Sequence, residues 1–148
     1  MITEYYFDNI VSVLKNIKET QKEKMKEAAQ MVAETIKKDG IIYIFGCGHS
    51  HLIALDCFYR AGGLANVSAM LDTDLMLHNG AAKSSRLEKM SGIAPEVFRR
   101  YTPTERDMIF IFSASGKNLV PVEMAEAARA RGIMSVVVSS SSYFGKGG

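Results

Sequence analysis

Two short groups of polar side chains follow apolar runs of the sequence, and their residue types suit the binding of a phosphate group. The first group is Gly46-Cys47-Gly48-His49-Ser50-His51, and the second is Ser113-Ala114-Ser115-Gly116-Lys117-Asn118. Hydroxyl groups, an amide and the backbone N–H groups at the start of a helix all donate hydrogen bonds to phosphate oxygens. The predicted phosphate ligands are the side chains of Ser50, Ser113, Ser115 and Asn118, with the backbone of Gly48, Ala114 and Gly116 beside them.

These loops also have other interpretations. Serine often caps a helix and asparagine often fills a turn, so Ser115 and Asn118 have structural roles available without a ligand. A dinucleotide fingerprint requires a third glycine where this chain has His51, which weakens a Rossmann-like nucleotide-binding domain but leaves it as an alternative. A P-loop requires Lys followed by Ser or Thr after the last glycine, and the sequence has neither there.

Three side chains are candidates for moving a proton near the bound phosphate: His51, His78 and Asp56. Cys47 stands beside a predicted helix N-terminus, which lowers thiol pKa values, so a reactive thiol is a further candidate. Cys47 and Cys57 form neither a Cys-x-x-Cys pair nor a zinc-binding cluster, and we expect both to be free thiols. We expect neither a metal ion nor a cofactor in the site.

The elements that carry the two loops are predicted from apolar runs and helical spacing. Continuous apolar runs indicate strands buried on both faces, and amphipathic spacing that ends at a glycine indicates helices. The predicted strands are residues 41–46, 65–70, 107–112 and 133–138, and the predicted helices between them are residues 50–61, 94–100 and 119–131. This alternation is typical of an α/β fold with a parallel sheet between helices and ligands beyond the carboxyl ends of the strands.

Residues 3–38 have apolar positions at helical spacing, which predicts two helices, or one bent helix, ahead of the first strand. The joint is expected at residues 18–22, where Thr20 and Glu23 match a capping box. The apolar stripe of these helices is expected to pack either on the chain's own sheet or in a subunit interface.

Two finer expectations concern the surroundings of the second loop. Val122, Ala125 and Ala128 are expected on the inner side of the helix at residues 119–131. The polar segment at residues 75–92, which includes His78, is expected either to cover a pocket or to cross the surface.

The composition indicates one globular domain. The chain has 148 residues, 47% of them hydrophobic and 23% charged, and a formal net charge of +2 without a run of basic residues. This charge pattern argues against nucleic acid as a partner, and the lack of an 18-residue apolar stretch argues against a membrane protein. The N-terminus lacks the basic-then-apolar pattern of a secretory signal, so we expect a cytoplasmic protein.

The sequence resembles the sugar isomerase (SIS) domain family, and most closely its phosphoheptose-isomerase-like branch, at residues 46–51, 58–63 and 113–116. The resemblance covers roughly residues 1 to 142 and implies one SIS domain. It would comprise N-terminal helices (1–39), an αβα core (40–138) and a Ser/Gly-rich tail (139–148). The implied fold is a three-layer αβα sandwich with a five-stranded parallel, flavodoxin-like sheet. Ser50, Ser113, Ser115 and Asn118 would hold the phosphate of a sugar phosphate.

The resemblance also implies a reaction. Isomerases of this family interconvert aldose and ketose phosphates by moving a proton between neighbouring carbons, commonly with a Glu and a C-terminal His. This chain has Arg60 where phosphoheptose isomerases place the Glu, with Asp56 one turn earlier. Because the family continues with a fifth strand and C-terminal helices, we expect a truncated form. The hypotheses are therefore a phosphosugar-binding, isomerase-like domain and a non-catalytic phosphosugar sensor.

Assembly is a further implication of the resemblance. Related domains assemble through helices, so we expect a homodimer or homotetramer with the pocket near a subunit boundary. A strand that ends at Val138 without a following strand would also leave an unprotected sheet edge.

Overall fold

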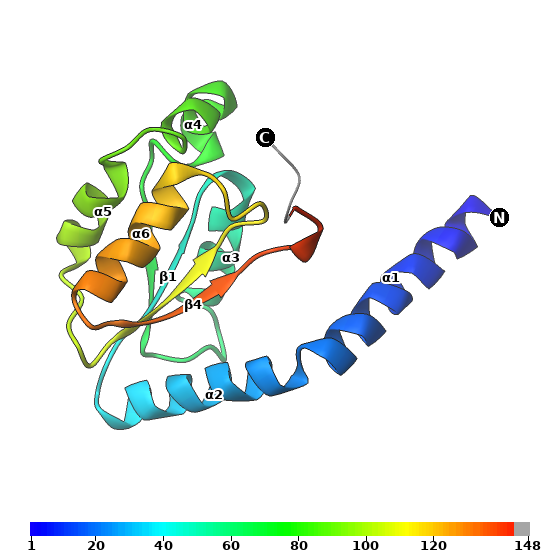
Figure 1. The fold of residues 1–148 in the computed structure, drawn as a ribbon, viewed down its shortest axis with the longest axis horizontal. Helices are drawn as coiled ribbons and strands as arrows, with labels where there is room; N and C mark the ends of the chain where they lie inside the picture. Colours follow the sequence, from blue (N-terminus) through cyan, green and yellow to red (C-terminus); the bar gives the residue numbers. More distant parts are fainter. Residues whose placement is uncertain (144–148) are drawn as a thin grey trace.

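The computed structural model describes residues 1–143, and its helices and strands alternate along the chain (Figure 1). The helices are α1 (Ile2–Thr20), α2 (Lys22–Lys37), α3 (His51–Cys57), α4 (Ala81–Leu87), α5 (Ile93–Tyr101) and α6 (Leu119–Ala130). The strands are β1 (Ile42–Gly46), β2 (Val67–Met70), β3 (Met108–Phe112) and β4 (Met134–Val138). Three short 3-10 turns are η1 (Gly48–Ser50), η2 (Leu77–Asn79) and η3 (Ser141–Tyr143).

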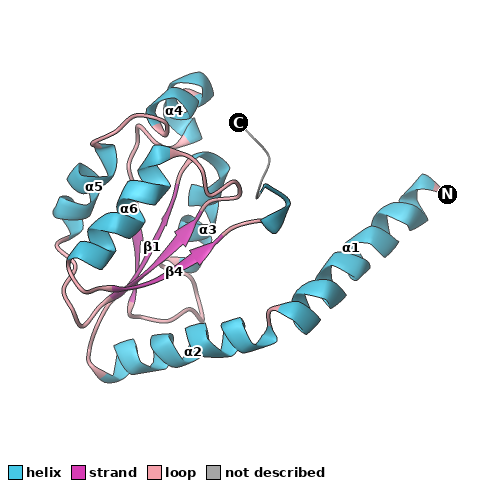
Figure 2. Cartoon of the chain, viewed as in Figure 1, coloured by secondary structure: helices cyan, strands magenta, loops and turns pink. Residues whose placement is uncertain are grey.

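The four strands form one parallel sheet in the order β2-β1-β3-β4, as a flavodoxin-like topology requires. Gly46 pairs with Phe112, and Phe112 pairs with Val138, so β1, β3 and β4 end at the same level. Figure 2 shows the strand arrowheads pointing toward one end of the molecule, where loops follow them. The predicted α/β fold with a parallel sheet and N-terminal helices is therefore confirmed.

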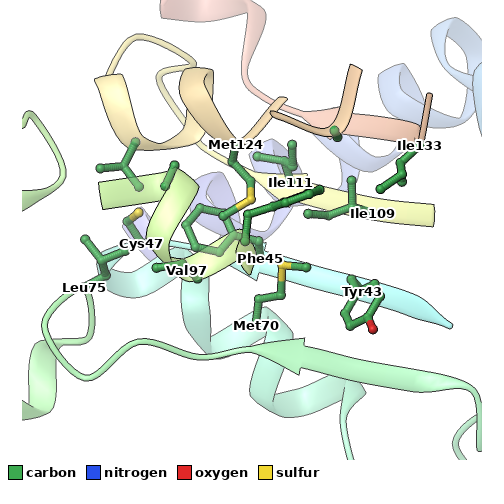
Figure 3. Close-up of a cluster of buried hydrophobic side chains, with 14 residues drawn as sticks. Tyr43, Phe45, Cys47, Met70, Leu75, Val97, Ile109, Ile111, Met124 and Ile133 are labelled. Atoms are coloured by element: carbon green, nitrogen blue, oxygen red, sulfur yellow. The ribbon is translucent and has the colours of Figure 1, made fainter. Parts of the chain in front are cut away.

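The larger part of the core lies between the sheet and helices α5 and α6 (Figure 3). Phe45, Ile109 and Ile111 point to this side and are almost completely buried, together with Met124 of α6. On the opposite side, α3 covers the sheet through a smaller cluster that consists of Ile44, Ala54 and Ala69. Helices on both sides explain why β1 is a continuous apolar run without alternation.

The inner face of α6 differs from the predicted one. Val122 is exposed, whereas Val120 and Met124 are completely buried with Ala128. Val120, Met124 and Ala128 pack into the core, which leaves Val122 on the outer side. The backbone N–H of Val120 also donates to the carbonyl oxygen of Glu88 (3.1 Å). The prediction was right for Ala128 and for Ala125, which is partly buried against the core, and wrong for Val122.

Helix α3 is shorter than predicted, ending at Cys57 and not at Ala61. Phe58 has an extended backbone, and Tyr59 has a φ of +50°, which a continuing right-handed helix excludes. The N–H of Phe58 donates to the carbonyl oxygen of Ala54 (3.1 Å) and closes the last turn.

The N-terminal helices α1 and α2 meet at Gln21, inside the predicted joint. The predicted capping box is wrong, because the hydroxyl of Thr20 donates back to the carbonyl oxygen of Asn16 (2.8 Å) at the end of α1. The side chain of Glu23 instead pairs with Lys26.

Helix α1 buries none of its residues and extends away from the rest of the chain, whereas α2 crosses the end of the sheet where the strands begin (Figure 1). The exposed apolar side chains of α1 include Ile10, Val11, Leu14 and Ile17, at the spacing of one helical face. Among the helices of residues 1–143, none combines the length and apolar character needed to cross a bilayer.

Strand β4 is at an edge of the sheet, and Val137 and Val138 are 51% and 43% exposed. The Ser/Gly-rich tail follows this strand. Its described part, residues 139–143, lies beside the second predicted loop (residues 113–118, called the serine loop below): the N–H of Ser140 donates to the carbonyl oxygen of Ala114 (3.0 Å). Residues 144–148 of the predicted tail lie outside the described residues.

Candidate functional site

A cavity of about 190 Å³ lies beyond the carboxyl ends of β1 and β3. Both predicted loops contribute to its wall, the first through Cys47 and Ser50 and the second through Ser113, Ala114, Ser115 and Asn118. Parallel strands that are neighbours in the sheet deliver their following loops to one place, as expected for a ligand site in such a fold. The structure therefore brings together five of the seven predicted phosphate ligands.

The second loop is shaped by its own hydroxyl groups. Ser113 is buried, and its Oγ accepts a hydrogen bond from the N–H of Gly116 (3.2 Å). Gly116 has a φ of +64°, a conformation that favours glycine. The Oγ of Ser115 accepts a longer hydrogen bond from the N–H of Lys117 (3.4 Å). The two hydroxyls keep the loop folded tightly around the end of β3.

Asn118 connects this loop to α6, of which it is the N-cap residue. Its side chain makes no capping hydrogen bond, although Asn at this position commonly does. The side chain lines the cavity. Because the N-terminus of a 12-residue helix carries a partial positive charge, an anion beside Asn118 is favoured.

The first loop is tied to the segment after β2, and this changes the role of Gly48. Its N–H donates to the carbonyl oxygen of Leu75 (2.8 Å), and its own carbonyl oxygen accepts from Nδ1–H of His51 (2.6 Å). The amide of Gly48 is therefore engaged within the protein. Gly48, with a φ of +56°, shapes the loop, while Ser50 is the hydroxyl that this loop places at the cavity.

The three predicted catalytic candidates lie elsewhere. His51 is 1% exposed, and its Nε2 has no hydrogen-bond partner. The centroids of the His51 and His78 rings are 5.3 Å apart, and the rings meet in an edge-on contact. Asp56 is exposed and pairs with Arg60 one turn along α3. Neither histidine is part of the cavity wall, and within residues 1–143 no group of three or more His, Cys, Asp or Glu side chains could hold a metal ion.

Cys47 is in the cavity wall but does not have the chemistry of a reactive thiol. Burial, with smaller contributions from Glu88 and Asp72, raises its pKa to about 12. A thiol attacks as the thiolate, so Cys47 stays in its unreactive protonated form near neutral pH. Its side chain also belongs to the hydrophobic core, beside Leu75 (Figure 3). The lowered pKa considered for this candidate thiol does not occur, because burial is the largest influence on Cys47.

Sequence reasoning did not single out Glu88, whose side chain faces the cavity. The buried hydroxyl of Ser84 donates to the carbonyl oxygen of Leu75 (2.9 Å), which anchors α4, and Glu88 follows one turn later. Partial burial raises the pKa of the Glu88 carboxyl, and the neighbouring Lys89 opposes that shift. The polar segment therefore covers a pocket, the first of its two predicted roles. The available signal was the four-residue spacing from Ser84, which places both side chains on one helical face.

A larger cavity of about 380 Å³ lies in the groove between α6 and β4. Its wall is mainly apolar and includes Val122, Ala125 and Val137. The wall also contains Ser113, Ser135, Glu126 and Arg129, but it does not include Ser50, Ser115 or Asn118. For binding a polar ligand, the smaller cavity is the better candidate despite its size.

The sequence-family model of the SIS domain matches residues 5–140, which is most of the chain. The chain belongs to the SIS domain family. Its curated relatives include UPF0309 proteins from Geobacillus thermodenitrificans (strain NG80-2), 42% identical over 140 residues, and from Caldanaerobacter subterraneus subsp. tengcongensis, 45% identical over 141 residues. These alignments cover 95% of this chain but only 56% and 57% of the two relatives. The SIS domain described here thus spans little more than half the length of these proteins.

The fold of this SIS domain also occurs in a solved enzyme structure. Phosphoheptose isomerase GmhA from Neisseria gonorrhoeae is similar with a TM-score of 0.73, over 96% of this chain and 75% of that one. At 18% identity, the likeness concerns the fold. The family resemblance predicted from the three sequence segments is confirmed.

Proposed function

We propose that the cavity beyond β1 and β3 binds a phosphosugar, with the phosphate at the serine loop and the sugar toward Glu88. The observation that carries this proposal is the arrangement of the cavity wall. Ser113, Ser115 and Asn118 stand at the N-terminus of α6, where an anion is favoured, and Glu88 supplies a carboxylate to the same cavity. A ligand with an anionic end and a hydroxyl-rich end suits both parts.

The size of the cavity supports a small ligand over a dinucleotide. Its volume of about 190 Å³ is below the range of roughly 300–1,000 Å³ that is usual for sites enclosing drug-sized ligands. NAD is larger than such ligands, and the sequence lacks the third glycine of its fingerprint at His51. A phosphosugar therefore fits this cavity better than a dinucleotide does.

For the reaction, we propose an aldose–ketose isomerisation in which Glu88 moves the proton. This reaction needs a base beside C1 and C2 of the sugar, the carbonyl carbon and its hydroxyl-bearing neighbour, between which the proton moves. Glu88 is the carboxylate among the described residues of the cavity wall, and its raised pKa lies closer to neutral pH than that of a free Glu. The similar fold of phosphoheptose isomerase GmhA is consistent with this class of reaction.

A non-catalytic phosphosugar sensor is the second candidate. It is favoured by Arg60, whose position in the family resemblance is that of a catalytic Glu and which here pairs with Asp56 on the surface. Incorporation of solvent deuterium into sugar phosphates separates the two functions. Incorporation supports the isomerase, and binding without incorporation supports the sensor.

We predict that the double variant Ser113→Ala and Ser115→Ala binds sugar phosphates at least several-fold more weakly. Each lost hydroxyl removes a neutral hydrogen bond worth about 0.5–1.5 kcal/mol, and Ser113 also holds Gly116 in place. Isothermal titration calorimetry measures the change, and Ser85→Ala on the exposed face of α4 is the matched control. An unchanged affinity in a folded double variant would contradict the assignment of the phosphate to this loop.

We also propose that the protein assembles into a homodimer or homotetramer through α1. Within residues 1–143 no residue of this helix is buried, and its apolar side chains, Leu14 among them, are exposed. We expect Leu14→Glu to shift the protein toward the monomer in light scattering at micromolar concentration, because a charge in an apolar interface is unfavourable. Lys15→Glu, on another face of α1, is the control, and a wild-type protein that is monomeric throughout would contradict the proposal.

A further inference from the structure

One wall of the cavity comes from neither predicted loop and is formed by Tyr143 in the turn η3. This turn follows β4, from whose end at Val138 it is separated by Ser139 and Ser140. The hydroxyl of Ser140 is 2.7 Å from that of Ser142, and the N–H of Tyr143 donates to the carbonyl oxygen of Ser140 (3.2 Å). The local hydrogen bonds form a compact turn that presents the tyrosine at the cavity.

The segment that leads into this turn is attached to the serine loop by two hydrogen bonds. The N–H of Ser113 donates to the carbonyl oxygen of Val138 (3.0 Å), and the N–H of Ser140 donates to that of Ala114 (3.0 Å). These two bonds continue the pairing of β3 and β4 beyond the sheet and into the site. The position of Tyr143 is therefore set relative to the hydroxyl groups that would hold the phosphate.

Part of the Tyr143 side chain is available to contact a ligand. It lines the cavity and is still 46% exposed, so much of its ring has no contact within the described chain. Tyrosine offers a rigid apolar face and one hydroxyl at its tip, a combination that contacts ligands having both C–H and O–H groups. Inorganic phosphate has only oxygens to offer, whereas a sugar has both kinds of group.

We propose that Tyr143 is a specificity-determining residue that contacts the sugar part of a bound phosphosugar and makes no contact with its phosphate. The proposal rests on the phosphosugar-binding function proposed above and names the side chain that distinguishes a sugar phosphate from free phosphate. The serine loop and Asn118 bind the part that both ligands share.

The test compares two classes of ligand on the same variants. Calorimetry with inorganic phosphate and with a panel of four- to seven-carbon aldose and ketose phosphates gives the affinities of wild type, Tyr143→Ala and Tyr143→Phe. We expect Tyr143→Ala to weaken the best-bound sugar phosphate by about three- to tenfold, which corresponds to one lost ring or hydroxyl contact. Its affinity for inorganic phosphate is expected to stay within about twofold of wild type.

The phenylalanine variant and a control make the test specific. A near-wild-type affinity for the sugar phosphate in Tyr143→Phe assigns the contact to the ring, and a loss equal to that of Tyr143→Ala assigns it to the hydroxyl. Either result supports the proposal. Tyr59→Ala removes a tyrosine that is 96% exposed and is not in the cavity wall, so it should change neither affinity.

Two results would overturn the proposal while leaving the phosphosugar function standing. The first is an unchanged sugar-phosphate affinity in folded Tyr143→Ala. The second is an equal loss for inorganic phosphate, which would mean that Tyr143 acts by supporting the serine loop. If wild type instead binds no member of the sugar-phosphate panel, the proposed function itself fails and the inference fails with it.

Discussion

Replacing Glu88 with glutamine is expected to lower the incorporation of solvent deuterium into a bound sugar phosphate by about 10²- to 10⁴-fold, the usual contribution of a positioned base. The amide has nearly the shape of the carboxylate but cannot accept the proton. Because Glu88 is the carboxylate in the described wall of the cavity, no neighbouring carboxylate there replaces it. Exchange followed by NMR measures the rate, and calorimetry measures binding in parallel.

The pH dependence of exchange adds a second readout. The pKa of Glu88 is raised in the folded protein, mainly by burial, so its proton is lost at a higher pH than in a free Glu. A base acts in its deprotonated form, and exchange should therefore rise as pH increases through this raised pKa. The glutamine variant should lack that rise.

The control for Glu88→Gln is Glu96→Gln, which changes an exposed carboxylate paired with Arg99 on α5. It should leave both exchange and binding at wild-type levels. Full exchange activity in folded Glu88→Gln would contradict the assignment of the base. Tight sugar-phosphate binding without exchange in wild type would favour the sensor.

Replacing Gly46 with alanine is expected to destabilise the protein by about 3 kcal/mol or more, the upper end of the range for overpacked positions. A Cβ atom at this position would lie 2.6 Å from both the carbonyl carbon and the oxygen of Ser50. These are backbone atoms of the first loop, so no side-chain rotation relieves the clash. Ser50 would have to move, and the site with it.

The matched control is Gly132→Ala at the end of α6. Gly132 has a φ of +67° but nothing within 4 Å of an added Cβ, so the cost is limited to about 1 kcal/mol of backbone strain. Chemical denaturation gives the free energy of unfolding of each variant. A stability loss for Gly46→Ala no larger than that of the control would contradict the prediction and show that the loop can shift at little cost.

The strands of this protein were determined by local sequence. The run at residues 108–112 is apolar throughout because its strand is covered by helices on both sides, and the predicted and observed bounds of β3 differ by one residue. The first strand ends at Gly46 as predicted, because only a residue without a side chain fits against Ser50. The apolar run and the glycine each act over a few residues, so both can be recognised in the sequence before the fold is known.

The orientation of the helices depended on tertiary contacts. The spacing of apolar residues in α6 fits more than one inner face, and packing of Val120, Met124 and Ala128 into the core leaves Val122 exposed. In α1 the difference is local: Thr20 forms a hydrogen bond within its own helix in place of capping the next one, because a Thr hydroxyl can bond to the backbone in either way.

The candidate site divides in the same way. Ser113, Ser115 and Asn118 are close in sequence and follow a recognisable strand, so their common location was predictable. Glu88 and Tyr143 are 55 residues apart in the chain (143 minus 88), and only the packing of α4 and the continuation of β4 bring them to one cavity. His51 shows the reverse case: its place in the loop suggested catalysis, but contacts with the segment after β2 bury it, because a side chain's exposure is a property of its neighbours in space.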